Sequence, residues 1–182
     1  GAAFAANLMT LFLFYEVMTL CTYPLVTHHG NEKARRGGRM YLGILIFTSV
    51  TFLLFAVGWT WHAAGTLDFR PGGILSTVDE AGVRSPLVAS SSLAVLFALF
   101  AFGIGKAALM PFHRWLPSAM VAPTPVSALL HAVAVVKVGV FTVLKVTLYV
   151  FGIDLLAQTD ASQLIAWVAA FTLLTSSLIA LG

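Results

Sequence analysis

Residues 87–111 read LVASSSLAVLFALFAFGIGKAALMP. Apart from Lys106, the run Leu87–Met110 is uncharged, and it is longer than the ~20 apolar residues that a membrane-spanning helix needs. A lysine in hydrocarbon is costly, at about 2.5–3.5 kcal/mol on insertion scales. Pro111 interrupts the run, and a helix break at membrane depth frees backbone groups that lipid cannot satisfy. The cation and the break together indicate a polar pathway inside a membrane protein.

The composition indicates the same class. Of the 182 residues, 59% are hydrophobic and 9% are charged, whereas a soluble domain carries about 25% charged residues. The net charge of +3 is too small to indicate a nucleic-acid partner, and the single cysteine, Cys21, excludes an internal disulfide. We therefore expect an all-α, polytopic helix bundle in a lipid bilayer.

Five spans are expected, one of them a proline-broken helix. They are Ala2–Val26, Met40–Ala63, Leu87 to the Pro111 break, Pro125–Phe151, and a segment from Ala161 onward. The His28–Arg39 loop holds four Lys/Arg residues, whereas the Gly65–Pro86 loop holds two Arg against three acids. The positive-inside rule places the first loop in the cytoplasm and the second outside. Residues 1–182 are predicted to be one transmembrane domain, a fragment of a longer multi-pass protein of the inner (plasma) membrane.

Two ionisable residues in the apolar runs are candidates for proton transfer. Glu16, near the centre of the first span, would pair with a buried cation and modulate its proton affinity, or would form only a structural ion pair between helices. Lys106 has small neighbours that leave room for water or a closely packed helix. Burial and a nearby carboxylate have opposite effects on a lysine, so moving the carboxylate would switch its charge. The alternative is that Lys106 snorkels to the cytoplasmic interface.

The fourth span adds three more ionisable groups. Lys137 lies near its middle, too deep to snorkel easily, and is a further candidate. His131 is six residues earlier, about 9 Å along a helix, and faces another side, so a shared metal site is not expected. His131 would relay protons or be a hydrogen-bonded core residue. Lys145 is expected to snorkel to the outer interface, and His113 to be solvated. No motif indicates a metal, a cofactor or a catalytic nucleophile.

Residues 105–117 (GKAALMPFHRWLP) and 122–131 (APTPVSALLH), together with 14–18 (FYEVM), carry a family resemblance. The sequence resembles the proton-translocating antiporter-like family. That family includes the large subunits of Mrp-type cation/proton antiporters and the antiporter-like subunits of respiratory complex I and of membrane-bound hydrogenases.

The resemblance implies a fourteen-helix-type subunit built from two inverted five-helix repeats, each with a broken helix, of which this chain looks like the first. Glu16 matches the family's glutamate, Lys106 the lysine before the broken-helix proline, Lys137 the relay lysine, and His131 a histidine of some branches. With residues 22–29 (TYPLVTHH), the pair His131 and Lys137 looks more like the Mrp D-type branch.

Three functions stay open at this point. The first is a subunit of a proton-coupled sodium or other monovalent-cation antiporter, in which protons hop through water between Glu16/Lys106 and Lys137/His131, with other membrane subunits as partners. The second is a proton-pumping subunit of a NADH:quinone oxidoreductase or hydrogenase, whose redox chemistry would lie in its partners, so an enzymatic role is left open. The third is a membrane scaffold whose ion pairs only fix helix packing.

Overall fold

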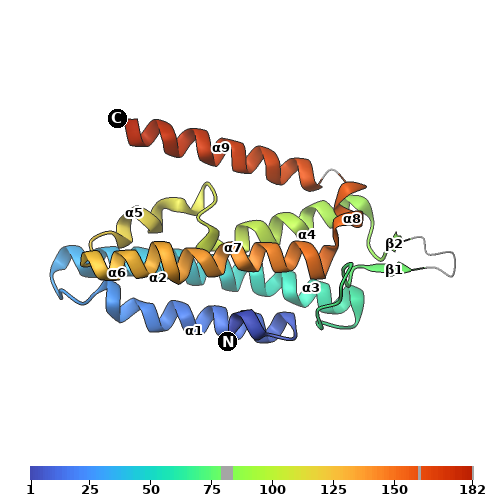
Figure 1. Cartoon of the computed structure of the whole chain (residues 1–182), viewed down its shortest axis with the longest axis horizontal. Coiled ribbons are helices and arrows are strands. Elements are labelled where there is room, and N and C mark those ends of the chain that lie inside the picture. The colour runs from blue at the N-terminus through green and yellow to red at the C-terminus, as the bar shows by residue number, and fades with distance from the viewer. Residues whose placement is uncertain (79–83, 160, 182) are drawn as a thin grey trace.

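The computed structural model describes residues 1–78, 84–159 and 161–181, and these form a helical bundle with one small hairpin. The α-helices are α1 (Leu8–Val26), α2 (Glu32–Thr48), α3 (Leu54–Ala64), α4 (Ser90–Gly103), α5 (Trp115–Ala119), α6 (Thr124–Ala128), α7 (Val135–Val146), α8 (Ile153–Ala157) and α9 (Ala161–Leu181). The strands β1 (Ser76–Val78) and β2 (Arg84–Pro86) pair antiparallel at one end of the bundle (Figure 1). Short 3₁₀ turns occupy Ala2–Phe4, Gly105–Ala107 and Phe112–Arg114.

In the described part of the chain, four helical segments are long and apolar enough to cross a membrane, which confirms the predicted membrane helix bundle. Two of them are composite. A π-helical stretch, Ser49–Leu53, joins α2 to α3 in one segment of 33 residues. Similar stretches, Leu129–Val133 and Thr147–Phe151, make α6 and α7 parts of a segment of 28 residues. The fifth expected span is different, because α4 has only 14 residues and ends in an irregular segment.

The predicted polar loop His28–Arg39 is too long. The Asn31 side chain accepts a hydrogen bond from the Ala34 backbone N–H at 2.7 Å, which caps α2 and starts it at Glu32. Ala34, Gly37 and Gly38 are buried, at the spacing of one helix face, while the charged residues between them are exposed. The charged residues around these three small residues made the segment look like a loop in the sequence.

These small residues allow close contacts with two neighbouring elements. A Cβ atom at Gly37 would lie 2.6 Å from the carbonyl oxygen of Ser118, on α5, and one at Gly38 would collide with the Thr27 side chain. The basic first turns of α2 are therefore a packed part of the bundle. They extend the helix beyond the apolar segment toward the His28–His29 end.

The expected external loop, Gly65–Pro86, has more structure than predicted. Gly65, at φ 67°, ends α3 in the left-handed conformation that glycine adopts without strain. The loop returns to the start of α1, where the Leu8 N–H donates to the Leu67 carbonyl oxygen at 2.9 Å. In the hairpin, Ser76 faces Pro86. Two of the loop's three acids, Asp79 and Glu80, lie outside the described residues.

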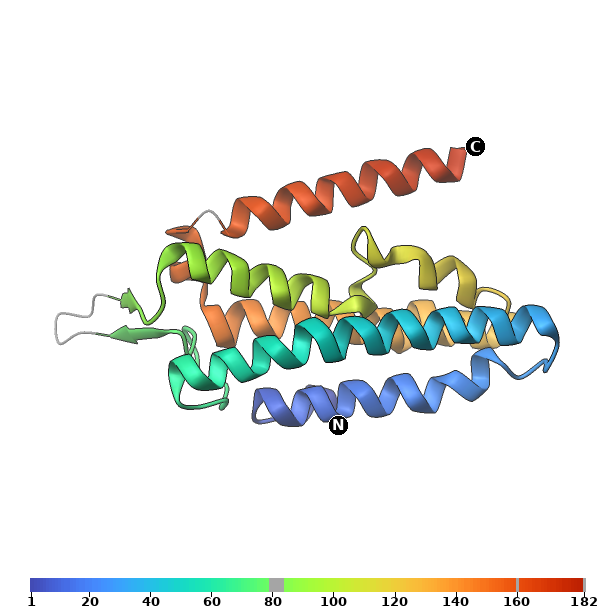
Figure 2. The same ribbon diagram turned by 180° about the vertical axis from the view of Figure 1, so that it is seen from behind.

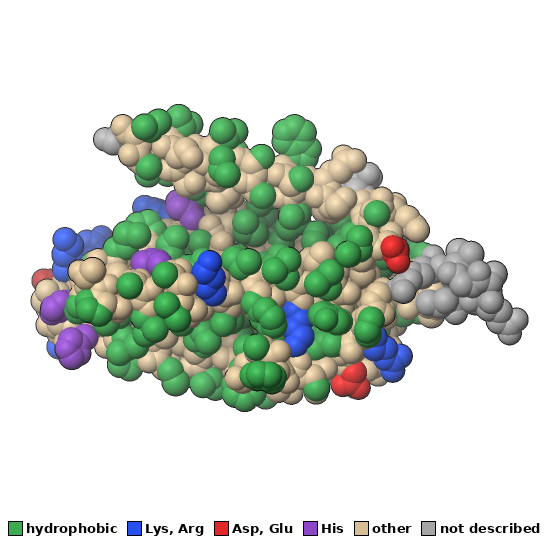
Figure 3. All heavy atoms as spheres, viewed as in Figure 1, with side chains coloured by type: hydrophobic (Ala, Val, Ile, Leu, Met, Phe, Trp, Pro, Cys, Tyr) green, Lys and Arg blue, Asp and Glu red, His purple; other side chains and the backbone are tan. Residues whose placement is uncertain are grey.

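The main apolar core lies between α1, α3, α4 and α7, and includes Leu11, Leu53, Phe100 and Phe151. Helix α9 stands beside the bundle with little packing, and Ala161 is its one buried residue in the described range (Figure 2). Figure 3 shows a largely apolar face that a few Lys or Arg side chains interrupt. The opposite ends of the bundle carry most of the polar groups, as a membrane protein requires.

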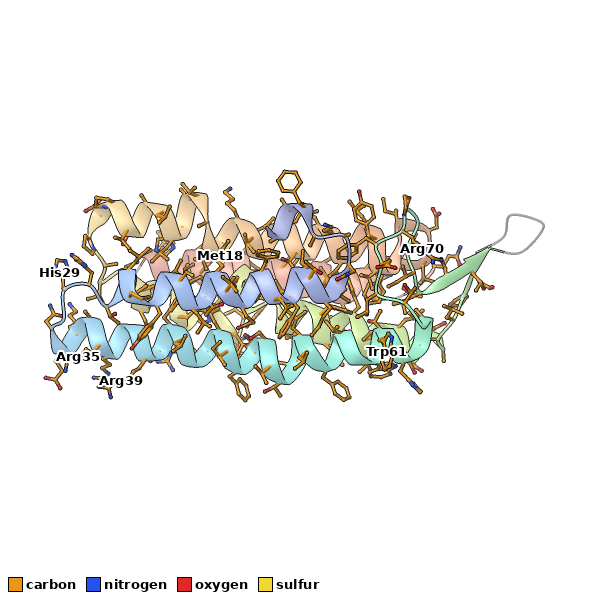
Figure 4. All side chains as sticks on the ribbon, turned by 90° about the horizontal axis from the view of Figure 1, so that it is seen from below. Met18, His29, Arg35, Arg39, Trp61 and Arg70 are labelled. Atoms are coloured by element: carbon orange, nitrogen blue, oxygen red, sulfur yellow. The ribbon has the colours of Figure 1, made fainter. Side chains whose placement is uncertain are left out.

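The two ends allow a test of the predicted orientation. His29, Arg35 and Arg39 lie at one end, and Trp61 and Arg70 at the other (Figure 4). In a Cys21→Ala background, a cysteine replacing His29 should be protected from an impermeant maleimide in intact cells, because the positive-inside rule places the basic end in the cytoplasm. A cysteine replacing Thr77, which is exposed in β1, should react. Labelling of the cysteine at 29 without permeabilisation would reverse the orientation.

Candidate functional site

The helix break comes earlier than the sequence indicated. Helix α4 ends at Gly103, so the interruption starts at Ile104 and not at Pro111. A 3₁₀ turn, Gly105–Ala107, follows, and Ala108 has a left-handed backbone with φ 55°. Lys106 therefore lies inside the break, where the sequence had placed it on the helix before the break. Glycines at 103 and 105 weaken the helix there, which gives a local reason for the early end.

Lys106 is fully buried, with 0% of its surface exposed. Its ammonium donates a hydrogen bond to the backbone carbonyl oxygen of Tyr15 and lies 3.3 Å from the centre of the Tyr15 ring. Burial of this side chain contradicts the snorkelling alternative, because the amine ends on protein groups inside the bundle. The cation has its two partners on α1, in the middle of the first span.

Glu16 follows Tyr15 on α1 and is half-buried. Both of its carboxylate oxygens are buried and lack a hydrogen-bond partner among the described residues. The Ser49 hydroxyl lies beside the carboxylate but donates to the Ile46 carbonyl oxygen at 3.1 Å. Glu16 and Lys106 are close enough to interact electrostatically. The predicted pair is thus brought together, but not as a hydrogen-bonded ion pair.

Protein groups satisfy the backbone that the break frees. The Lys106 N–H donates to the Tyr15 hydroxyl at 3.0 Å, and the Trp115 indole N–H donates to the Gly105 carbonyl oxygen at 2.9 Å. Further on, the Met110 N–H donates to the hydroxyl of Thr172 on α9 at 3.2 Å. Irregular backbone at membrane depth is tolerated where it is buried in protein in this way.

Glycines allow two helices to close around the break. A Cβ atom at Gly139, on α7, would lie 2.5 Å from both the Ala107 nitrogen and the Lys106 carbonyl carbon. A Cβ atom at Gly105 would collide with the Thr48 hydroxyl on α2. The small neighbours of Lys106 therefore serve close packing, one of the two uses expected from the sequence.

A line of buried polar side chains leads from Glu16 toward the basic end of the bundle. Thr19 and Thr22 follow Glu16 on α1, one turn apart, and are almost fully buried. The Thr22 and Tyr41 hydroxyls share a hydrogen bond of 2.6 Å, and the Tyr41 ring packs edge-on against Trp115 with centroids 5.6 Å apart. The Thr19 hydroxyl donates to the Tyr15 carbonyl oxygen at 3.3 Å, so this buried polar strip borders the residues that contact Lys106.

The other predicted site residues lie further from the break. Lys137 is exposed on α7, two residues before Gly139, so it does not contact Lys106 directly. His131 is half-buried in the π-helical stretch, with its Nε2 atom buried and unpartnered among the described residues. The structure therefore brings Glu16 and Lys106 together and leaves His131 and Lys137 on another part of the bundle.

One minor expectation was wrong, and another stays a prediction. Lys145 reaches toward the start of α1 and the expected external loop, which is the direction in which it was expected to snorkel. It donates to the Ala5 carbonyl oxygen at 2.6 Å and lies 4.4 Å from the centre of the Phe69 ring. His113 is half-buried, with an unpartnered Nδ1 among the described residues, where solvation was expected. It borders an open cavity of about 570 Å³ between the break and α9, which Trp167 also lines.

Sequence reasoning assigned no role to Tyr15 or Trp115 at the break. Tyr15 lies one residue before Glu16, and a tyrosine within an apolar span was the available signal, because its hydroxyl needs a partner. Trp115 follows the Pro111 break and is fully buried.

Comparison with known proteins identifies the family of this site. Residues 5–182 match the family described as NADH:quinone oxidoreductase/Mrp antiporter, transmembrane. The chain belongs to this antiporter family. The match covers the break, Lys106 and Glu16 together, so the site lies within the family's shared transmembrane region.

The curated relatives of this chain include both quinone oxidoreductase subunits and cation/proton antiporter subunits. The chain is 31% identical, over all of its length and 26% of the relative's, to NAD(P)H-quinone oxidoreductase chain 5 of Picosynechococcus sp.. It is 36% identical, over 81% of its length and 17% of the relative's, to a Na(+)/H(+) antiporter subunit of Alkalihalophilus pseudofirmus. The chain thus spans about a quarter or less of these relatives. They do not resolve the D-type branch, which stays a prediction.

A solved antiporter structure shares the fold. The Mrp complex from Dietzia sp. superposes with a TM-score of 0.64 at 34% identity, covering 78% of this chain and 15% of that chain. This likeness confirms that the chain is similar to part of a larger antiporter-like membrane protein.

The close approach at Gly139 generates a stability prediction. Gly139→Ala should destabilise the protein, because overpacking costs about 1–3 kcal/mol and the added methyl group meets backbone, which cannot turn aside. Gly58→Ala is the matched control: a Cβ atom at Gly58 would meet nothing within 4 Å, and alanine favours helix by about 0.5–1 kcal/mol. Thermal unfolding of the purified protein in detergent should show a lower Tm for Gly139→Ala and no loss for Gly58→Ala. Equal Tm values would contradict the described packing.

Proposed function

We propose that this chain is part of a membrane subunit that couples proton movement to exchange of a monovalent cation such as sodium. One observation carries the proposal: a fully buried lysine in a helix break lies beside a carboxylate whose two buried oxygens have no hydrogen-bond partner in the described part of the chain. Buried ionisable groups are expensive in a membrane and usually mark an ion pathway. Family membership supports the same conclusion.

The proposed chemistry is reversible protonation of the Lys106 amine. A neutral amine would accept a proton delivered through water from the Thr22–Tyr41 end, and the resulting ammonium would be stabilised by the Glu16 charge. Any change in the distance between carboxylate and ammonium alters that stabilisation, and so alters the tendency of Lys106 to release its proton. Release toward the opposite side completes the transfer.

His131 and Lys137 are proposed as the groups that carry the proton after Lys106 in the same pathway. Their support is weaker, because Lys137 is exposed and neither residue contacts Lys106 directly. Lys137 lies on the same helix as Gly139, which packs on the Lys106 backbone. A shift of α7 would therefore move Lys137 and also displace the backbone at Lys106. Because the two lysines are not in contact, proton transfer between them requires bridging water.

A redox-driven proton pump is the second candidate. It is favoured by the relative named NAD(P)H-quinone oxidoreductase chain 5, which matches the whole length of this chain. The same Glu16–Lys106 site would then move protons in response to changes in partner subunits. In either case we propose an inner-membrane location and a hetero-oligomeric complex, for which the weakly packed α9 offers apolar surface.

The proposal is tested by replacing Lys106 in the full-length protein within its complex. Lys106→Met keeps much of the side-chain volume but cannot carry a proton. Sodium-induced dissipation of a pH gradient in everted vesicles should fall by about 100-fold or to background. Lys33→Met is the matched control, because Lys33 is exposed at the basic end and should leave exchange unchanged. Normal exchange by Lys106→Met would remove Lys106 from the mechanism.

A second variant separates transport from a scaffold role. Glu16→Gln/Lys106→Met removes both charges, and replacing buried ion pairs with neutral groups often leaves stability unchanged or improved. The transport proposal predicts a complex with near-normal yield and Tm but no exchange. Near-normal exchange by this variant would support the scaffold instead.

A further inference from the structure

Tyr15 holds Lys106 at both ends of the residue. Its hydroxyl accepts the Lys106 backbone N–H at 3.0 Å, its carbonyl oxygen accepts the ammonium, and its ring centre lies 3.3 Å from the ammonium nitrogen. Both residues are fully buried and are 91 positions apart in the sequence. No other residue in the described part of the chain hydrogen-bonds the Lys106 ammonium.

The neighbouring carboxylate should be the stronger partner. Charge-assisted hydrogen bonds to carboxylates are shorter and stronger than those to neutral carbonyls, above all where the dielectric constant is low. Yet the Glu16 oxygens have no hydrogen-bond partner among the described residues, and the ammonium contacts the residue before it. The arrangement therefore separates two opposite charges that could otherwise combine.

We propose that Tyr15 is a positioning residue that keeps the Lys106 ammonium off the Glu16 carboxylate. This inference rests on the proposed proton transfer and adds a residue to it. A direct ion pair would hold the proton on Lys106, whereas a gap lets Glu16 influence the amine without trapping it. The ring supplies a second, weaker attraction through its negative face.

Few other charged groups face Lys106. Among the described residues, α1 contributes Tyr15 and Glu16, and α7 contributes the backbone at Gly139. Trp115 on α5 bonds to the neighbouring Gly105, and Tyr41 on α2 interacts with Glu16. The lysines of α7 point elsewhere, since Lys137 is exposed and Lys145 bonds to the Ala5 carbonyl oxygen. A rise in the titration midpoint of Lys106 on altering Tyr15 is therefore attributable to Glu16, because losing the attraction of the ring would by itself lower the midpoint.

The test follows the nitrogen-15 signal of the Lys106 side chain against pH, in the full-length protein within its complex in membranes. The signal is assigned by its loss in Lys106→Met. Tyr15→Leu keeps the backbone carbonyl oxygen but removes the ring beside the ammonium and the hydroxyl that holds the Lys106 N–H. Without these two side-chain contacts the ammonium should move to Glu16, which raises the pH midpoint by about 1 unit or more. The alkaline limit of exchange should shift in the same direction, and exchange should be slower. Adding Glu16→Gln to Tyr15→Leu should abolish the rise.

Phe100→Leu is the matched control, because Phe100 is a buried aromatic residue that packs on Phe151 and not on Lys106. It should lose similar thermal stability and leave the midpoint unchanged. If Tyr15→Leu does not assemble, Tyr15→Met fills more of the same volume without an aromatic face and should give the same rise. A midpoint that stays or falls in the assembled Tyr15 variant overturns the proposal.

The titration tests the positioning role of Tyr15, and the transport assay tests the proposed function, so either claim can be wrong without the other. If the wild-type complex shows no cation/proton exchange, the proposed function is wrong, and the side-chain signal still decides whether Tyr15 separates Lys106 from Glu16. If exchange is present but the midpoint does not rise, Tyr15 has no positioning role while the function stands.

Discussion

The structure depends on the burial of one lysine inside an apolar helix bundle. A cation that cannot reach water must find its partners within the protein, and Lys106 finds them on Tyr15. That contact is made from the 3₁₀ turn Gly105–Ala107, which begins after α4 has ended at Gly103. The remaining features of the site, including the glycines at the helix contacts and the Trp115 hydrogen bond, compensate for this interruption.

Much of this arrangement follows from the sequence. The apolar runs predict the membrane bundle, and Glu16 and Lys106 stand out because charge is rare within such runs. Other features depend on tertiary contacts. The break begins at Ile104 for two reasons. Glycines at 103 and 105 weaken the helix, and glycines on α4, the 3₁₀ turn and α7 allow close backbone contacts in its place. The early start of α2 likewise depends on Gly37 and Gly38 packing against neighbours, which a count of charges does not reveal.

The partner of the lysine was the least predictable element. Electrostatics favours Glu16, and the sequence therefore suggested a pair. The backbone of α1 instead presents the carbonyl oxygen and ring of Tyr15 to the ammonium. Neighbouring residues on a helix point about 100° apart, so an error of one position moves a contact to another face. The sequence shows how far along a span a residue lies. It does not show in which direction a side chain points within a broken segment.

High-resolution cryo-electron microscopy of the intact complex, with ordered water visible, is the most direct test of this account. We expect an interruption of the helix between Gly103 and Phe112, a buried Lys106 ammonium on the Tyr15 carbonyl oxygen and ring, and water between Lys106 and Glu16. A continuous helix through residues 104–108, or a Lys106 side chain that extends to the lipid headgroups, would contradict it.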